Sequence, residues 1–181
     1  MLVNSKNLPI DVANPVNLNC SLNKNLLGYW LGVDGLAGGA EINDLLGVHH
    51  GVLNSTKWSE QSKFNYTQSL LFSGAQITTV SDSTSKLKTS SQLTVSFWMK
   101  LDSLPSVSHY PLVVKWKDGV VDERIWAISV ENTTNIVRFD TSPDGIFYGG
   151  NKVSSLSSIS ANQWYFVTGI ATGTSNQIFL N

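Results

Sequence analysis

The chain has 181 residues, of which 41% are hydrophobic and only 14% are charged, and its formal net charge is −1. This length fits one domain, and the hydrophobic content is sufficient for a real core, which excludes a disordered chain. Nucleic-acid binding by phosphate neutralisation needs a basic patch, and the sequence has no basic cluster. The one cysteine, Cys20, excludes an internal disulfide and a thiolate metal cluster, and we interpret it as a small apolar residue.

The first 25 residues are polar and rich in asparagine, and they include Pro9 and Pro15. This composition predicts an extended N-terminal arm over residues 1–25. The start of the chain lacks the charged-then-apolar pattern of a signal peptide, and no apolar run has transmembrane length. We therefore expect a protein that is made in the cytosol, unless a signal has been removed, and that has no membrane partner.

Short apolar runs separated by turn residues predict strands through the first half of the chain. They lie at residues 26–31, 44–53 (a turn that leads into a strand), 69–74 and 75–80, with a serine- and threonine-rich loop over 81–92. The clearest element follows at residues 93–100, where apolar and polar residues alternate without a break. Such alternation predicts a half-buried strand with Leu93, Val95, Phe97 and Met99 toward the core. Trp98 interrupts the polar side, so that side is covered by a second layer or lines a groove.

The second half continues in the same way. Predicted strands lie at residues 112–116, 125–130, 136–139, 163–170 and 177–181, with turns between them, and no amphipathic helical run exceeds about two turns. Short strands at nearly regular spacing are typical of an all-β sandwich or jelly roll.

A series of short segments also occurs in a characteristic order. They are Leu27–Trp30, Asp44 with Gly47, His50–Leu53, Ser69–Gly74, Leu93–Lys100, Gln163–Val167 and Ile178–Asn181. This order resembles the laminin G-like, concanavalin A-like lectin/glucanase superfamily, in its bacterial and phage form, over residues 26–181. The resemblance implies a two-sheet antiparallel jelly-roll sandwich that follows the N-terminal arm.

Two departures from the family pattern bear on this expectation. Members of the family carry further strands after the last matching asparagine, so we expect residues beyond 181, or another chain, to complete the sandwich. The loop at residues 32–43 lacks the compact acidic and glycine pattern that usually precedes Asp44, which weakens a calcium site carried over from the family. No cofactor is required, and calcium is a candidate ligand. Its candidate oxygen ligands are Asp34, Asn43 and Asp44, with Asp82 more distant, although we favour an Asx-type turn at Asn43–Asp44.

Other chemistry has weaker support. The glucanase branch of the family uses paired carboxylates on one strand, whereas the adjacent pair here, Asp122–Glu123, would point to opposite faces of a strand. Hydrolysis is therefore not expected. The neighbouring His49 and His50 would also point apart, and we interpret His50 as a packing residue before Gly51 and not as a metal ligand.

Glycan binding has more support, because sugars lie with their apolar faces on flat aromatic rings while a few fixed polar groups bind their hydroxyls. Trp116 stands between two lysines before an Asp-Gly turn, and Tyr110 and Tyr148 are predicted to lie in loops. Together with Trp98, these are the candidate glycan-binding residues. The alternative is that such aromatics only cover the open end of the sandwich. The remaining strand tryptophans, Trp30, Trp126 and Trp164, are interpreted as core residues.

Three functions are therefore considered. The first is a non-enzymatic surface module that recognises glycans or a neighbouring subunit, as a decoration or fibre component on the surface of a phage-like virion. The alternative is a carbohydrate-binding module of a secreted, extracellular bacterial enzyme or adhesin. The third, a glycoside hydrolase, is disfavoured. In each case the chain is expected to be part of a larger chain or assembly.

Overall fold

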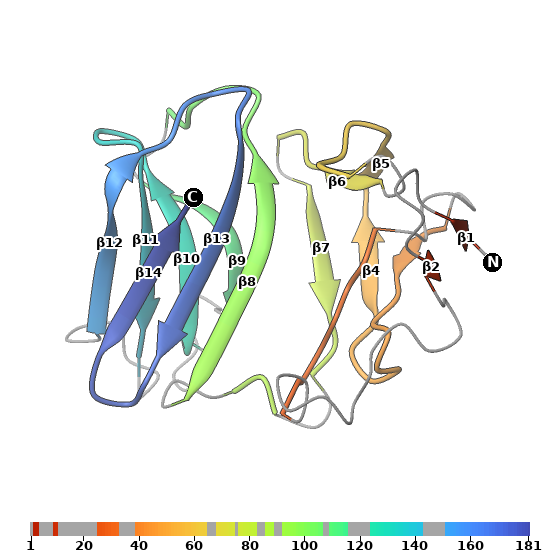
Figure 1. Ribbon diagram of the computed structural model, residues 1–181, viewed down its shortest axis with the longest axis horizontal. Helices are drawn as coiled ribbons and strands as arrows, with labels where there is room; N and C mark the ends of the chain where they lie inside the picture. The colour runs from red at the N-terminus through yellow and green to blue at the C-terminus, as the bar shows by residue number, and fades with distance from the viewer. Residues whose placement is uncertain are drawn as a thin grey trace. The chain divides into compact units, whose positions relative to one another are not determined.

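The chain forms two compact units, Met1–Ser85 (unit 1) and Lys86–Asn181 (unit 2). Its described residues form strands, turns and connecting segments without any helix, which confirms the all-β prediction (Figure 1). None of these segments is a helix with the length and apolarity needed to cross a membrane. The computed structural model describes residues 2–3, 9–10, 25–32, 39–64, 68–74, 76–82, 86–88, 92–106, 109–115, 124–142 and 151–181.

Unit 1 consists of short antiparallel pairings. Its strands are β1 (Leu2–Val3), β2 (Pro9–Ile10), β3 (Glu41–Ile42), β4 (Gly51–Asn54), β5 (Lys57–Ser59), β6 (Ser69–Leu71) and β7 (Ile77–Val80). They form a sheet of order β3-β4-β7 and the separate pairs β5-β6 and β1-β2. The last pair lies within the predicted extended arm.

The prediction of a strand at residues 26–31 is wrong. This segment contributes only an isolated bridge between Trp30 and Asp44. The Tyr29 carbonyl accepts the Leu45 N–H at 2.8 Å beside this bridge, but the Tyr29 N–H donates to the Asp44 side chain at 2.8 Å. Because this N–H is bonded to a side chain, it is not available to extend a sheet ladder.

Unit 2 contains two larger antiparallel sheets (Figure 1). One has the order β14-β13-β8 and the other the order β12-β11-β10-β9. Their strands are β8 (Leu93–Lys100), β9 (His109–Lys115), β10 (Trp126–Glu131), β11 (Ile136–Thr141), β12 (Asn151–Ser158), β13 (Trp164–Ala171) and β14 (Asn176–Leu180). The sequence predicted all of these except β12.

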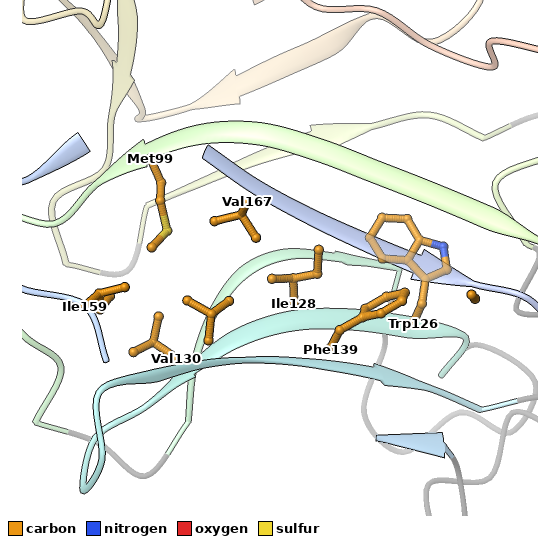
Figure 2. Close-up of a cluster of buried hydrophobic side chains, with 9 residues drawn as sticks. Met99, Trp126, Ile128, Val130, Phe139, Ile159 and Val167 are labelled. Atoms are coloured by element: carbon orange, nitrogen blue, oxygen red, sulfur yellow. The ribbon is translucent and has the colours of Figure 1, made fainter. Parts of the chain in front are cut away.

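The two sheets of unit 2 enclose one hydrophobic core. Figure 2 shows Met99 and Val167, from β8 and β13, directed toward Ile128, Val130 and Phe139 of the facing sheet. The sheets approach closely at Gly169, where an added Cβ would lie 3.1 Å from both Ile128 and Phe139. Leu93, Val95 and Phe97 also pack on this core, so the predicted alternation of β8 is confirmed. This architecture fits a concanavalin A-like sandwich.

The strand missed from the sequence, β12, lies at the edge of the four-stranded sheet. Only Val153 and the buried Ser155 turn inward, and the remaining side chains are exposed. The Ser155 hydroxyl accepts the Val137 N–H at 3.0 Å and donates to the Ser157 carbonyl at 2.7 Å. Because most of its side chains are exposed at the sheet edge, this strand contains few apolar residues.

Candidate functional site

The outward side of the β14-β13-β8 sheet carries a group of aromatic and uncharged polar side chains. The register places Trp98 opposite Phe166, Lys100 opposite Trp164, and Ser96 opposite Thr168. We call this surface the aromatic face. Its outward side chains are Thr94, Ser96, Trp98, Lys100, Trp164, Phe166, Thr168, Ile170, Gln177, Phe179 and, after β14, Asn181.

The aromatic rings are arranged at one end of this face. The centroids of Trp98 and Phe166 lie 5.1 Å apart, with their planes tilted by 43°. Next to them, the Lys100 ammonium lies 5.9 Å from the centroid of the Trp164 ring and 3.4 Å from an Asp102 carboxylate oxygen. All three rings are half-buried and do not belong to the hydrophobic core. The face therefore presents apolar ring surface on the side away from the core.

Polar groups lie beside the rings. The Ser96 and Thr168 hydroxyls are 3.0 Å apart and share a hydrogen bond across the strands. The side-chain oxygen of Asn181 accepts the Phe166 N–H at 3.2 Å, which holds Asn181 against β13. Phe179 is 54% exposed and extends the apolar surface over β14. Aromatic rings and hydroxyls, which lie together on this sheet, are two kinds of group that bind sugars.

Of the candidate glycan-binding residues, Trp98 lies on this face. The sequence predicts that the side of the strand with Trp98 is covered by a second layer or lines a groove. The core assignment of Trp164 is wrong, because Trp164 pairs with Lys100 and shares the outward side with Phe166. Trp164 and the buried Val167 lie on opposite sides of the sheet, because side chains alternate along a strand and the two are an odd number of residues apart. The sequence concealed this alternation, because apolar residues follow one another at the start of β13.

The loop position predicted for Tyr110 is wrong, because Tyr110 lies within β9, pairs with Val130 and packs against the core. Trp116 and Tyr148 lie outside the described residues. Trp126 is buried in the core as predicted, and its indole N–H donates to the Leu87 carbonyl at 3.0 Å. A glycan-binding role for Trp116, Tyr110 and Tyr148 stays a prediction.

In unit 1, Asp44 organises a turn. Its two carboxylate oxygens accept the backbone N–H groups of Tyr29 and Leu46, and of Val48 and His49, at 2.8, 3.1, 3.2 and 2.9 Å. Burial alone would raise the pKa of Asp44, but these backbone donors outweigh it and hold the pKa below its usual value. Asp44 is therefore a buried, ionised anchor for the turn.

This arrangement bears on the calcium candidates. A carboxylate offers about four lone-pair sites, and the bound N–H groups fill those of Asp44. Asn43 is exposed, Asp82 is half-buried, and Asp34 lies outside the described residues. Across the described part of the chain, no three His, Cys, Asp or Glu residues are grouped so that they could hold a metal ion. The Asx-type turn accounts for the four bonds of Asp44, and calcium binding stays a prediction.

The sequence indicates His50 as a packing residue, but the packing residue in this region is His49. His49 is buried, whereas His50 is exposed. A His49 ring nitrogen, Nδ1, lies 3.0 Å from the Ser81 carbonyl, and because a carbonyl only accepts, Nδ1 carries the hydrogen. The Trp30 indole N–H in turn donates to the His49 carbonyl at 2.7 Å.

A second polar cluster lies on the other sheet of unit 2. The Arg138 guanidinium donates to Asp140 at 2.9 and 2.6 Å and to Glu131 at 3.3 Å. Burial would lower the pKa of Arg138, but the two carboxylates outweigh it and raise the pKa above its usual value. Asp140 and Glu131 therefore both bind the guanidinium of Arg138. The pair Asp122–Glu123 lies outside the described residues.

A laminin G-like family model, described as the concanavalin A-like lectin/glucanases superfamily, matches residues 72–181. The chain belongs to this superfamily. The match spans β7 and all of unit 2, a shorter range than the 26–181 expected from the sequence, and it includes the whole aromatic face. No curated protein and no solved structure matches the chain. The superfamily includes both glycosidases and non-enzymatic lectins. Members of both kinds bind carbohydrate, so membership fits a carbohydrate-binding or recognition module.

Proposed function

We propose that this concanavalin A-like domain is a non-enzymatic module that recognises glycans, and that the aromatic face is its binding surface. The observation that carries the proposal is the placement of Trp98, Phe166 and Trp164 on the side of the sheet away from the core. None of these three rings belongs to the hydrophobic core of the sandwich.

The chemistry of the face suits a sugar. A pyranose ring has an apolar side formed by C–H groups, which can lie on an indole or phenyl ring, and hydroxyls at its edge. On this face, Ser96 and Thr168 lie in the row next to Trp98 and Phe166, so a ring stacked on the aromatics would bring its hydroxyls near them. Because all of these groups stand on a paired sheet, the surface is preformed and costs little ordering.

The non-enzymatic part of the proposal rests on the carboxylates. Glycoside hydrolysis needs an acid and a second carboxylate about 5–10 Å apart on either side of the bond. The outward strand positions of the aromatic face carry no acidic residue, and the nearby Asp102 is paired with Lys100. On the other sheet, Glu131 and Asp140 both bind Arg138. We expect no release of reducing ends when the purified chain is incubated with β-glucan. Hydrolysis that survives further purification would overturn this part.

For the setting, we propose the surface of a phage-like virion, with a carbohydrate-binding module of a secreted enzyme or adhesin as the alternative. The low charged fraction of 14% and the abundance of serine, threonine and asparagine support a surface protein exposed outside the cell. Labelling of the surface of virus particles by an antibody against this chain would support the virion setting. Recovery only from culture medium, covalently joined to a hydrolase domain, would support the second.

The test of glycan recognition is a glycan array followed by calorimetric titration of the bound glycans. Trp98→Ala removes the central ring, and we expect at least tenfold weaker binding, equivalent to about 1.4 kcal/mol. The control is Leu156→Ala on β12, because Leu156 is fully exposed on the other sheet of unit 2. Binding that is equal in both variants would contradict the assignment of the face. No binding to any glycan would favour a protein subunit as the partner.

A further inference from the structure

Resting on the proposed function, we infer that the aromatic face takes an uncharged glycan, and not one that carries carboxylate, sulfate or phosphate groups. Among the outward side chains of β8, β13 and β14, which are all described, Lys100 alone is charged. Every other group is an aromatic ring, an aliphatic chain, a hydroxyl or an amide.

The charge of Lys100 is already compensated. Its ammonium lies 3.4 Å from an Asp102 oxygen, and it also faces the Trp164 ring at 5.9 Å. The Lys100 side chain is only 18% exposed, whereas that of Asp102 is 66% exposed. An acidic sugar approaching Lys100 would therefore meet the negative charge of Asp102 first and would have to displace it. The cation is arranged to shape the face and not to attract an anion.

The hydrogen-bonding groups that the face does offer suit neutral hydroxyls. The Ser96 and Thr168 hydroxyls share one hydrogen between them, which leaves one O–H donor and further lone pairs directed to other partners. Thr94 and Gln177 are exposed in the next row and add a hydroxyl and an amide. Such groups both donate and accept, as sugar hydroxyls do. Binding of an anion would instead require several donors without a competing carboxylate.

The experiment compares neutral oligosaccharides with counterparts of the same backbone that bear a carboxylate, such as lactose with sialyllactose and galactose oligomers with galacturonic acid oligomers. We expect the neutral member of a bound pair to bind at least tenfold more tightly. We also expect less than about a twofold change in its Kd between roughly 0.01 M and 1 M salt, where the Debye length falls from about 30 Å to about 3 Å. A variant that exposes the cation, Asp102→Asn, should gain binding to the carboxylated member.

The outcomes separate this inference from the proposed function. Preference for the carboxylated member, with affinity that falls as salt rises, would overturn the inference. If that binding is also lost in Trp98→Ala and kept in Leu156→Ala, the aromatic face remains the glycan surface and only the ligand class is wrong. If no member of either class binds to the wild-type chain, the proposed function fails and the inference fails with it.

Discussion

Replacement of Asp44 by asparagine keeps the size of the side chain but removes half of its accepting capacity. The new amide oxygen can still accept from Tyr29 and Leu46, whereas the amide NH₂ would face the N–H groups of Val48 and His49. Two hydrogen bonds to a charged group are lost, each worth about 1.5–3 kcal/mol. Because water can reach the freed N–H of the exposed Val48, we expect a total loss of about 2–4 kcal/mol.

The assay is urea unfolding of the full chain, followed by tryptophan fluorescence and circular dichroism. Trp30 and Trp58 report on unit 1, so the transition that includes them should move to lower urea in Asp44→Asn. Asp102→Asn is the matched control, because its carboxylate is 66% exposed and makes a surface ion pair, and we expect a change below about 0.5 kcal/mol. An Asp44→Asn chain as stable as the control would refute the role of Asp44 as a turn anchor.

Three further predictions concern stability. Because the pKa of Asp44 is lowered in the folded chain, its contribution is present at neutral pH and is lost as the pH falls below about 3.9; acid titration should show this loss in the wild type and not in Asp44→Asn. Phe139→Ala removes a fully buried ring and should cost about 3–5 kcal/mol in urea unfolding, against less than about 0.5 kcal/mol for the exposed Leu156→Ala. Gly32→Ala would place a Cβ 1.8 Å from the Gln68 carbonyl oxygen, so it should shift the thermal transition of unit 1 downward; an unchanged transition would show that this contact is absent in solution.

The strands of unit 2 were largely predictable from the sequence, because a strand with one buried side imposes its period on the residue types. In β8, Leu93, Val95, Phe97 and Met99 all turn to the core as the alternation predicts. By contrast, β12 was not predictable from apolar content, since it is an edge strand in which Ser155 bonds to the backbone of the neighbouring strand.

The candidate site was predicted only in part. Trp98 could be singled out because it breaks a polar alternation, whereas its neighbour across the sheet, Phe166, comes from a strand distant in the chain and is brought close only by register. The turn at Asp44 was predicted, but its bond to the Tyr29 N–H was not, because Tyr29 is 15 residues away. Local patterns specify which face a side chain takes, and long-range pairing decides what it meets there.

Heteronuclear NMR of the isotope-labelled chain can show whether glycans bind on the aromatic face. Titration with a neutral oligosaccharide found on the array should shift the indole N–H signals of Trp98 and Trp164. The Trp126 indole, which is buried and bonded to the Leu87 carbonyl, should stay in place. Shifts confined to residues outside β8, β13 and β14, with Trp98 and Trp164 unmoved, would show that glycans do not bind on the aromatic face.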